Sequence, residues 1–206
     1  MKDLPINEKE DLIIGTILEN QVTIIEGETG SGKTTQLPIF LYEAGFSQKG
    51  TIGVTQPRRF AVTSVAKYVA ELSGKPMGDI VGYQVRFDRA SNYDTAVKFM
   101  TAGILLQELQ SDRELSRYSV IMVDEAHERT AEMDLLLGFL KNVIRERKDL
   151  RLIIASATID TQKFSRYFSN APIVKVSGRM YPVEICHLAS PIDDAENLIE
   201  RVAEKV

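Results

Sequence analysis

The chain has 206 residues, 44% of them hydrophobic, and a formal net charge of −4 at pH 7. A chain of this length and hydrophobic content can bury one substantial core, or form one domain and the start of another. The negative net charge argues against a general electrostatic attraction to nucleic acid but permits a local basic groove. No apolar run is long enough to span a bilayer, no signal peptide is recognisable, and Cys186 is the only cysteine. We therefore expect a soluble intracellular protein without a membrane partner, in the cytoplasm or the nucleus.

Segments with helical spacing of apolar residues alternate along the chain with short β-branched runs. In chain order, they predict a helix over residues 8–20, a strand over 22–26, a helix from 35 to about 44, a strand over 51–55, a helix over 58–72, strands over 80–87 and 96–100, a helix over 101–109, a strand over 120–123, a helix over 131–148, and strands over 151–155 and 173–176. Pro38 predicts a kink or irregular turn, and Gly45 a helix C-cap.

Three of the predicted helices show a recognisable apolar face. The side chains expected on these buried faces are Leu12, Ile13, Thr16 and Ile17 in the helix over 8–20, Val62, Val65, Ala66 and Val69 in the helix over 58–72, and Leu136, Phe139, Leu140 and Val143 in the helix over 131–148. Each face is expected to pack against the predicted strands.

The alternation of strands and helices predicts an α/β fold, with a mostly parallel sheet covered by helices on both faces. Ligands of such sheets bind beyond the carboxyl ends of the strands. The predicted strands end in, or are followed by, polar residues or glycine, namely Gly27, Thr55, Thr101, Asp124 and Ser156. Because parallel strands end at a common edge, we expect these residues to line one edge of the sheet.

Residues 27–34 fit the phosphate-binding pattern G-x-x-x-x-G-K-[ST]. The glycines let successive backbone amides point inward as an anion-binding nest, and the next helix directs its positive end to the same point. Lys33 is expected to reach the β- and γ-phosphates and the Thr34 hydroxyl to bind Mg²⁺. The alternative is a glycine-rich turn that only caps a helix. The apolar run over 22–25 favours a nucleotide site.

Asp124 and Glu125 directly follow the apolar run over 120–123. An acidic residue that leaves a buried strand near such a loop is well placed to hold Mg²⁺, directly or through water. We expect the metal site to comprise Thr34, Asp124 and Glu125, with Glu125 also orienting and deprotonating the attacking water. The alternative is an ordinary helix N-terminus, where acidic residues favour the dipole.

His127 is a candidate catalytic base, metal ligand or connecting hydrogen-bonder. A metal role is disfavoured because the other histidine of the chain is His187, beside the single cysteine Cys186. Cys186 and His187 are interpreted as strand neighbours that point to opposite faces. A hydrolase triad of His127 with Ser156 is disfavoured because the G-x-S-x-G elbow is absent.

With these residues in place, residues 4–189 resemble the first RecA-like domain of a DEAH-box RNA helicase. The family's motifs occur in order at residues 27–35, 55–59, 101–105, 124–130 and 156–158, and residues 178–183 resemble its passage out of this domain. The resemblance implies a RecA-like P-loop NTPase, a three-layer sandwich that binds ATP with Mg²⁺ and releases ADP. The residues it assigns to the nucleotide loop are Gly27, Glu28, Thr29, Gly30, Ser31, Gly32, Lys33, Thr34 and Thr35.

The resemblance also implies an RNA-binding role. Arg58, Arg59 and Thr101 are expected to contact the phosphates of a single RNA strand that crosses the sheet edge, and Arg86 with Phe87 to form a turn that meets the same RNA. The alternative for Arg58 and Arg59 is a solvated pair at a helix start, which the helix dipole disfavours. The alternative for Phe87 is packing in the core.

Three further residues take their roles from the same resemblance. Ser156 and Thr158 are expected to couple hydrolysis to movement of a pair of domains. Tyr68 departs from the family pattern, which commonly places an arginine there to stack on the nucleotide base. Tyrosine can stack as well but lacks the cation, and the alternative is that Tyr68 packs on its own helix.

The sequence shows no counterpart of the family's second RecA-like domain and its arginine finger. We expect residues 1–189 to be the first RecA-like domain and residues 190–206 to be a linker and the start of the second. A lost arginine finger costs roughly 10³ to 10⁵ in rate, so the isolated fragment is expected to be a weak ATPase. The expected partners are single-stranded RNA, the second RecA-like and C-terminal domains of the full-length protein, and activator proteins.

The leading hypothesis is therefore an NTP phosphohydrolase, the ATP-binding and ATP-hydrolysing motor domain of an RNA helicase. One alternative is an ATP-dependent clamp that remodels RNA–protein complexes without processive unwinding. The other is a DNA translocase of the same superfamily. A strand-displacement assay separates the first alternative, and stimulation of the ATPase by RNA or DNA separates the second.

Overall fold

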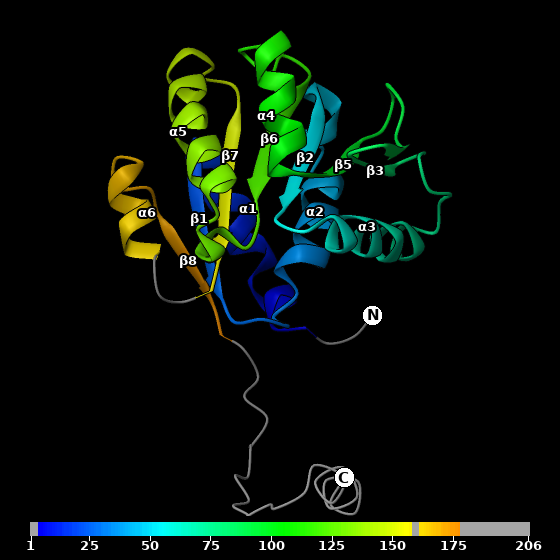
Figure 1. Ribbon diagram of the computed structural model, residues 1–206. Coiled ribbons are helices and arrows are strands. Elements are labelled where there is room, and N and C mark those ends of the chain that lie inside the picture. The colour runs from blue at the N-terminus through cyan, green and yellow to red at the C-terminus, as the bar shows by residue number, and fades with distance from the viewer. Residues whose placement is uncertain (1–3, 158–160, 178–206) are drawn as a thin grey trace, which may run out of the picture.

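The computed structural model describes residues 4–157 and 161–177, whose eight strands form one sheet (Figure 1). The strands are β1 (Val22–Gly27), β2 (Thr51–Gln56), β3 (Val81–Val85), β4 (Asp88–Ala90), β5 (Val97–Thr101), β6 (Tyr118–Val123), β7 (Arg151–Ser156) and β8 (Ile173–Val176). Their order is β4-β3-β5-β2-β6-β7-β1-β8, and all neighbouring pairs are parallel except β3 with β4. The predicted, mostly parallel sheet is confirmed.

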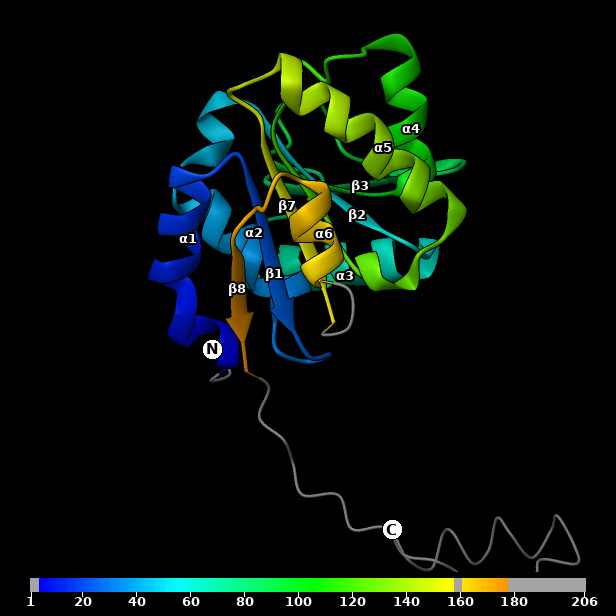
Figure 2. The same cartoon turned by 90° about the vertical axis from the view of Figure 1, so that its left-hand side faces the viewer.

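Helices cover both faces of the sheet, as Figures 1 and 2 show. The α-helices are α1 (Glu10–Glu19), α2 (Lys33–Glu43), α3 (Arg59–Ser73), α4 (Ala102–Ser111), α5 (Ala131–Glu146) and α6 (Thr161–Tyr167), and the short 3-10 helices are η1 (Pro5–Lys9), η2 (Phe46–Lys49) and η3 (Ala126–Glu128). The first three α-helices pack on one face and the last three on the other. This is the predicted three-layer α/β sandwich. None of the helices in the described residues has the length and apolarity that a membrane crossing needs.

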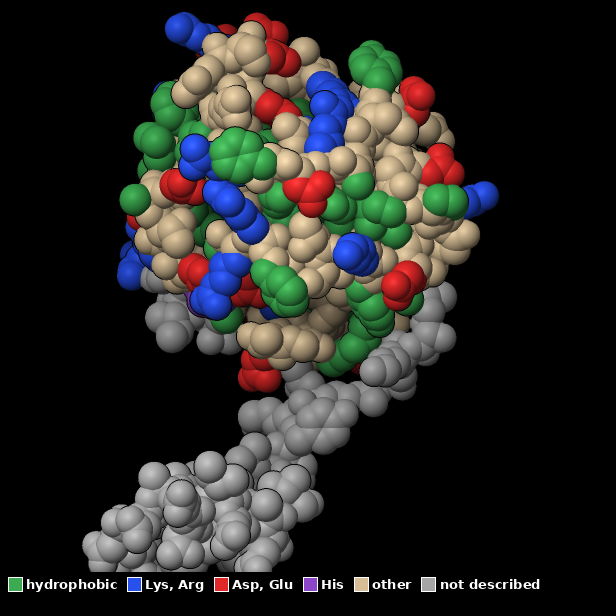
Figure 3. All heavy atoms as spheres, turned by 45° about the vertical axis from the view of Figure 1, so that its right-hand side comes forward, with side chains coloured by type: hydrophobic (Ala, Val, Ile, Leu, Met, Phe, Trp, Pro, Cys, Tyr) green, Lys and Arg blue, Asp and Glu red, His purple; other side chains and the backbone are tan. Residues whose placement is uncertain are grey.

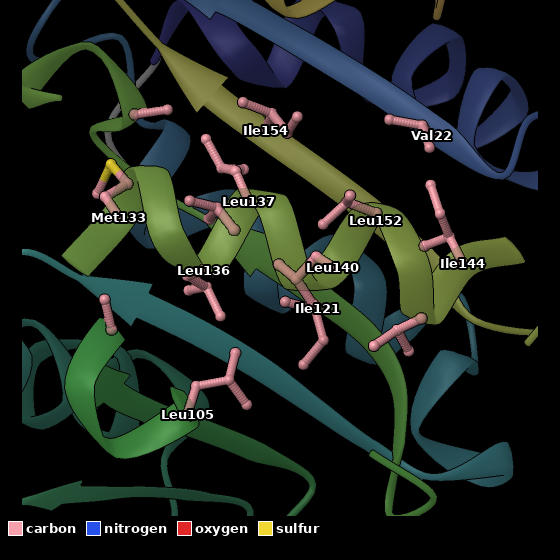
Figure 4. Close-up of a cluster of buried hydrophobic side chains, with 14 of the residues drawn as sticks. Val22, Leu105, Ile121, Met133, Leu136, Leu137, Leu140, Ile144, Leu152 and Ile154 are labelled. Atoms are coloured by element: carbon pink, nitrogen blue, oxygen red, sulfur yellow. The ribbon is translucent and has the colours of Figure 1, made fainter. Parts of the chain in front are cut away.

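Two hydrophobic cores lie on the two sides of the sheet, because successive side chains of a strand point to opposite faces. On β1, Ile24 belongs to the core under α4, α5 and α6, and Ile25 to the core under α1, α2 and α3. Figure 4 shows the first of these cores, in which Leu136 and Leu140 of α5 lie over Ile121 of β6. Because both faces are covered, the central strands are buried along their length and largely apolar, which is the pattern that predicted a parallel sheet.

The carboxyl ends of five parallel strands meet at one edge of the sheet. These strands are β1, β2, β5, β6 and β7, and they end at Gly27, Gln56, Thr101, Val123 and Ser156. The predicted common edge is therefore confirmed. It brings together residues that are more than a hundred positions apart in the sequence.

Two predicted core positions are wrong. Phe139 is 47% exposed and Leu12 is 53% exposed. The buried face of α5 includes Met133, Leu136, Leu137, Leu140, Val143 and Ile144. At about 100° per residue, Phe139 lies roughly 100° from the centre of this face. Leu12 precedes the buried Ile13 by one residue and is turned away by the same rotation.

Two local features differ from the sequence prediction. The strand expected over 80–87 ends at Val85, and a two-residue turn leads into the antiparallel β4. Helix α6 was not predicted, because its seven residues are too few for a clear periodic pattern. Pro38 lies inside α2, where the helical pattern placed it, and the kink or irregular turn expected there stays a prediction. Gly45, at φ 82°, follows the C-cap of α2 as predicted.

Gly53 on β2 provides a test of the core. A Cβ at this position would lie 2.9 Å from Ile121 Cδ1 and from the Tyr118 ring, and the Tyr118 hydroxyl is fixed by a hydrogen bond to Glu108. We predict that Gly53→Ala lowers the free energy of unfolding by roughly 1–3 kcal/mol, because the core has no room for the methyl group. The measurement is urea denaturation.

The matched control is Gly138→Ala on α5, where an added Cβ meets nothing within 4 Å. This substitution should stabilise the chain by roughly 0.5–1 kcal/mol, because alanine is the better helix former. Equal stabilities of the two variants would contradict the prediction.

Candidate functional site

The predicted phosphate-binding loop connects β1 to α2 at the common edge. Gly30 and Gly32 adopt positive φ angles of 84° and 98°, which glycine reaches without steric cost. A Cβ at Gly32 would also lie 2.8 Å from Ile6 Cγ2, and the backbone amide of Ile6 donates to the Ser31 carbonyl at 3.2 Å. The 3-10 helix η1, which contains Ile6, therefore supports the loop from outside, a contact that the sequence did not predict.

Lys33 points its ammonium group into the loop. Its Nζ donates hydrogen bonds to the carbonyl of Gly27 and, at 2.9 Å, to the carbonyl of Glu28, and lies 3.3 Å from Ser31 Oγ. Burial lowers the pKa of Lys33, and the negative charges of Asp124 and other nearby carboxylates oppose this shift. The loop thus holds a buried cationic group on its own carbonyl oxygens, and a cation at this point suits the binding of an anionic group.

Asp124 joins three elements at the end of β6. Its side chain is fully buried. Oδ2 accepts hydrogen bonds from Thr34 Oγ1 of α2 at 2.5 Å and from Gln56 Nε2 of β2 at 2.6 Å, and Oδ1 accepts from the backbone amide of Glu125 at 2.9 Å. The two predicted halves of the nucleotide site are therefore in direct contact.

Gln56 is a site residue that the sequence prediction did not single out. It is the last residue of β2, it is almost fully buried, and its amide donates to the carboxylate of Asp124. The available signal was a polar amide directly after an apolar strand. The hydrogen-bond partner of Gln56 could not be predicted, because the sequence does not show that β2 and β6 are neighbours in the sheet.

The oxygen atoms of Thr34 and Asp124 fit Mg²⁺, which prefers hydroxyl, carboxylate and phosphate oxygens. Within residues 4–157 and 161–177, no three His, Cys, Asp or Glu side chains are grouped so as to hold a metal ion by themselves. Protein-bound Mg²⁺ commonly uses one or two carboxylates together with the phosphates of a substrate. The donor set therefore fits a metal ion that binds together with a nucleotide.

Glu125 has a strained backbone and a perturbed carboxyl group. Its φ of 51° is costly for a residue other than glycine. Burial raises the pKa of Glu125, the negative charge of Asp124 raises it further, and His127 and Lys33 oppose the shift. A carboxylate with a raised pKa is a better proton acceptor near neutral pH, as a general base requires.

His127 connects Glu125 to the strand end at β7. Its Nδ1 lies 3.3 Å from Glu125 Oε2 and 3.3 Å from the backbone amide of Ala157, which donates to it. Nδ1 accepts from the amide only when it carries no proton. Of the three predicted roles for His127, this geometry supports the connecting hydrogen-bonder.

Ser156 is fully buried at the end of β7, and its hydroxyl donates to the carbonyl of Ala157 at 2.9 Å. This hydrogen bond is not directed at His127, so the geometry gives no support to the hydrolase triad. Thr158, Cys186 and His187 lie outside the described residues, as do the segments over 178–183 and 190–206.

Basic and aromatic side chains are exposed at the same edge of the sheet. Arg58 is 77% exposed by its side chain and lies 3.4 Å from Glu128, and Arg59 is exposed at the start of α3. Thr101 is the N-cap residue of α4, and its side chain does not accept a hydrogen bond from the first turn. Figure 3 views the molecule from the side of α3 and β3, where basic and hydrophobic side chains are interspersed.

Arg86 and Phe87 form the two-residue turn between β3 and β4. Phe87 is 91% exposed at a φ of 69°, and the Arg86 guanidinium lies 4.9 Å from the centre of its ring. The alternative that Phe87 packs in the core is therefore wrong. Tyr68 is 43% exposed on α3, so its ring is also accessible to a ligand.

A family model described as DEAD/DEAH box helicase matches residues 8–166. The chain is 46% identical over 203 residues to the ATP-dependent RNA helicase HrpA of Borreliella burgdorferi, covering 98% of the chain and 25% of that protein. It is 48% identical over 206 residues to an HrpA homolog of Haemophilus influenzae, covering 100% of the chain and 16% of that protein. It is 50% identical over 196 residues to HrpA of Escherichia coli, covering 94% of the chain and 15% of that protein. The chain thus spans a quarter or less of the length of these relatives.

The buried carboxyl of Asp124 predicts a pH effect on stability. Burial raises the pKa of Asp124, although Thr34, Glu125 and Gln56 donate hydrogen bonds that oppose the shift. The folded chain therefore holds this proton more tightly than the unfolded chain, and stability falls as pH rises above the ordinary aspartate pKa of about 3.9. Asp124→Asn cannot titrate. We predict that its stability falls less steeply with pH than that of the parent, measured by urea denaturation from pH 4.5 to 8.

Asp149→Asn is the matched control, because the hydrogen bond from Arg147 lowers the pKa of Asp149. A lowered pKa gives the opposite sign, with stability lost as pH falls. The prediction is contradicted when the Asp124→Asn variant shows the same slope with pH as the parent.

Proposed function

Because the chain belongs to the DEAD/DEAH box helicase family, we propose that residues 1–189 form the first RecA-like, ATP-hydrolysing motor domain of an RNA helicase. Residues 190–206 then lead into a second RecA-like domain. The observation that carries the proposal is the 2.5 Å hydrogen bond from Thr34 to Asp124, which unites the phosphate-binding loop with the acidic strand end. The similar proteins are named ATP-dependent RNA helicases, one of them as a homolog.

In this proposal, the loop over 27–35 holds the phosphates of ATP. The backbone amides and the ammonium of Lys33 supply positive charge, and the accessible ring of Tyr68 stacks on the base. Thr34 and Asp124 would hold Mg²⁺ with Glu125 beside them, and the bound ion would neutralise charge on the phosphates. Gln56 keeps the Asp124 carboxylate oriented by its hydrogen bond of 2.6 Å.

Hydrolysis in this proposal needs a residue that orients water and accepts its proton. Glu125 is suited to this role because burial and the charge of Asp124 raise its pKa. His127 Nδ1 lies 3.3 Å from the Glu125 carboxylate and from the backbone amide of Ala157, so a proton on Nδ1 would pair with Glu125, whereas the unprotonated nitrogen accepts from Ala157. The segment that contains Ser156 and Thr158 then couples hydrolysis to movement of the domain pair.

The RNA strand is proposed to cross the edge at the ends of β2, β5 and β3. Arg58 and Arg59 would contact its phosphates, with Thr101 at the start of α4. Phe87 presents an exposed ring on which an unpaired base can stack, and Arg86 adds a cation beside it. These contacts favour a single strand, because stacking on a side chain requires an unpaired base.

The isolated chain is proposed to hydrolyse ATP slowly. Phosphoryl transfer depends on charge placed around the transition state, and an arginine finger contributes roughly 10³ to 10⁵ in rate. In this family the finger would come from the second RecA-like domain. Closure of the two domains, rather than binding of ATP alone, would then set the rate.

We predict that Glu125→Gln in the full-length protein lowers the ATP turnover number at least about 100-fold, because the general base is lost. The dissociation constant for ATP with Mg²⁺ should change less than about twofold, since the amide keeps the shape of the side chain. Multiple-turnover hydrolysis at saturating ATP and equilibrium nucleotide binding measure the two quantities. Glu132→Gln, on the exposed side of α5, is the control and should leave both unchanged. Turnover unchanged by Glu125→Gln would refute the role of Glu125.

We predict that Phe87→Ala weakens the binding of single-stranded RNA to this chain roughly fivefold or more, because one stacking contact is lost. The measurement is fluorescence anisotropy with labelled RNA, and single-stranded DNA of the same sequence tests the translocase alternative. Tyr93→Ala is the matched control. Tyr93 is 85% exposed and lies 5.7 Å from the Arg117 guanidinium, but it precedes β5 at the opposite edge. Equal losses in the two variants would exclude a specific contact at Phe87.

A further inference from the structure

Glu26 is a buried carboxylate directly before the nucleotide loop. It is the next-to-last residue of β1, and its side chain is 11% exposed. Along β1, Ile24 and Glu26 point to the same face of the sheet, the one covered by α4, α5 and α6. An apolar residue would be the ordinary choice at such a position.

Two side chains from later parts of the chain meet this carboxylate. Thr161, the first residue of α6, donates a hydrogen bond from its hydroxyl to Glu26 Oε2, and Thr161 is itself buried. Lys175 of β8 lies directly opposite Glu26 in the strand pairing, and its Nζ is 3.1 Å from Glu26 Oε1. We call Glu26, Thr161 and Lys175 the Glu26 cluster.

The Glu26 cluster also lies beside the end of β7. In the pairing of β1 with β7, Glu26 is opposite Ser156. The backbone of Glu26 is therefore paired with Ser156 in the sheet, and the side chain of Glu26 accepts a hydrogen bond from Thr161. Residues 158–160 lie outside the described residues, but both flanking positions are described.

The energetics of the Glu26 cluster argue for a role in positioning. Burying a carboxylate costs free energy that an ion pair with an exposed lysine repays only in part, and Lys175 is 69% exposed by its side chain. Well-packed apolar residues at Glu26 and Thr161 would stabilise the chain at least as well. What the polar pair provides instead is a directional contact between two segments.

We infer that Glu26 is a positioning residue that couples the nucleotide loop to the start of α6 at Thr161. A displacement of the loop moves Glu26, which is bonded to it through Gly27, and the hydroxyl of Thr161 follows. Lys175 extends the contact to β8, the last described strand. This inference rests on the proposed function and deepens it, because it names a contact between the nucleotide loop and α6, the helix that follows Ser156 and Thr158 in the chain.

The test is amide hydrogen exchange in this chain without nucleotide. Thr161→Val keeps the shape of the side chain and removes the hydroxyl. We expect amides of residues 28–33 to exchange roughly threefold to tenfold faster in this variant, because a distant support of the loop is lost. Amides of residues 119–122 in β6 should stay unchanged. Thr161→Ser, which keeps the hydroxyl, should restore the exchange of the loop to within about twofold of the parent.

Ser165→Ala is the matched control on the same helix. Ser165 is buried, and its hydroxyl donates to the carbonyl of Ala171 at 2.8 Å, away from Glu26. It should leave residues 28–33 unchanged. The inference is overturned when Thr161→Val leaves the loop unchanged, when Ser165→Ala affects the loop equally, or when β6 changes in parallel with the loop.

A separate measurement isolates the proposed function. Addition of ADP with Mg²⁺ to the parent chain should raise its melting temperature, as any ligand specific for the folded state does. No rise would contradict the nucleotide site, whereas the exchange experiment reports on the coupling in the free chain. Failure of one is thus distinguishable from failure of the other.

Discussion

The hydrogen bonds to the buried carboxylate of Asp124 are the interaction on which the rest of the site depends. A carboxylate without solvent needs donors, and here they come from Thr34, Gln56 and the backbone of Glu125. Each donor can reach it only if β1, β2 and β6 end at the same level. The strand order that places β2 beside β6, and β7 between β6 and β1, is what meets this requirement.

The nucleotide loop is held from several sides. The segment before α1 packs Ile6 against Gly32, where only glycine leaves room. On the other side, Glu26 fixes the strand that enters the loop through contacts to α6 and β8. Lys33 fills the interior. A loop supported in this way can keep its amides oriented for an anion, because reorganisation on binding is small.

The end of β2 links the two proposed binding regions. Gln56 turns inward to Asp124, and Arg58 and Arg59 turn outward at the start of α3. Arg58 also lies 3.4 Å from Glu128, which follows the acidic strand end. In the proposed function, RNA and nucleotide would therefore contact the same short segment at the end of β2, so that a displacement of this segment at one binding region would also displace it at the other. The proposed RNA side is built on β2, β5 and β3, and the proposed nucleotide side on β1 and β6.

The sequence by itself determined the fold class, most element positions and the place of the glycine-rich loop, because strand and helix patterns and the spacing of Gly27, Gly32, Lys33 and Thr34 are local properties. It also placed Asp124 and Ser156 at strand ends. Tertiary structure alone decided which strand ends are neighbours, and so the contacts of Gln56 and Glu26 could not be predicted from the sequence. It also decided that Phe139 and Phe87 face solvent, since exposure depends on what packs against a side chain. Local patterns of residues can be recognised in the sequence, whereas the contacts between side chains on different strands depend on the strand order of the sheet.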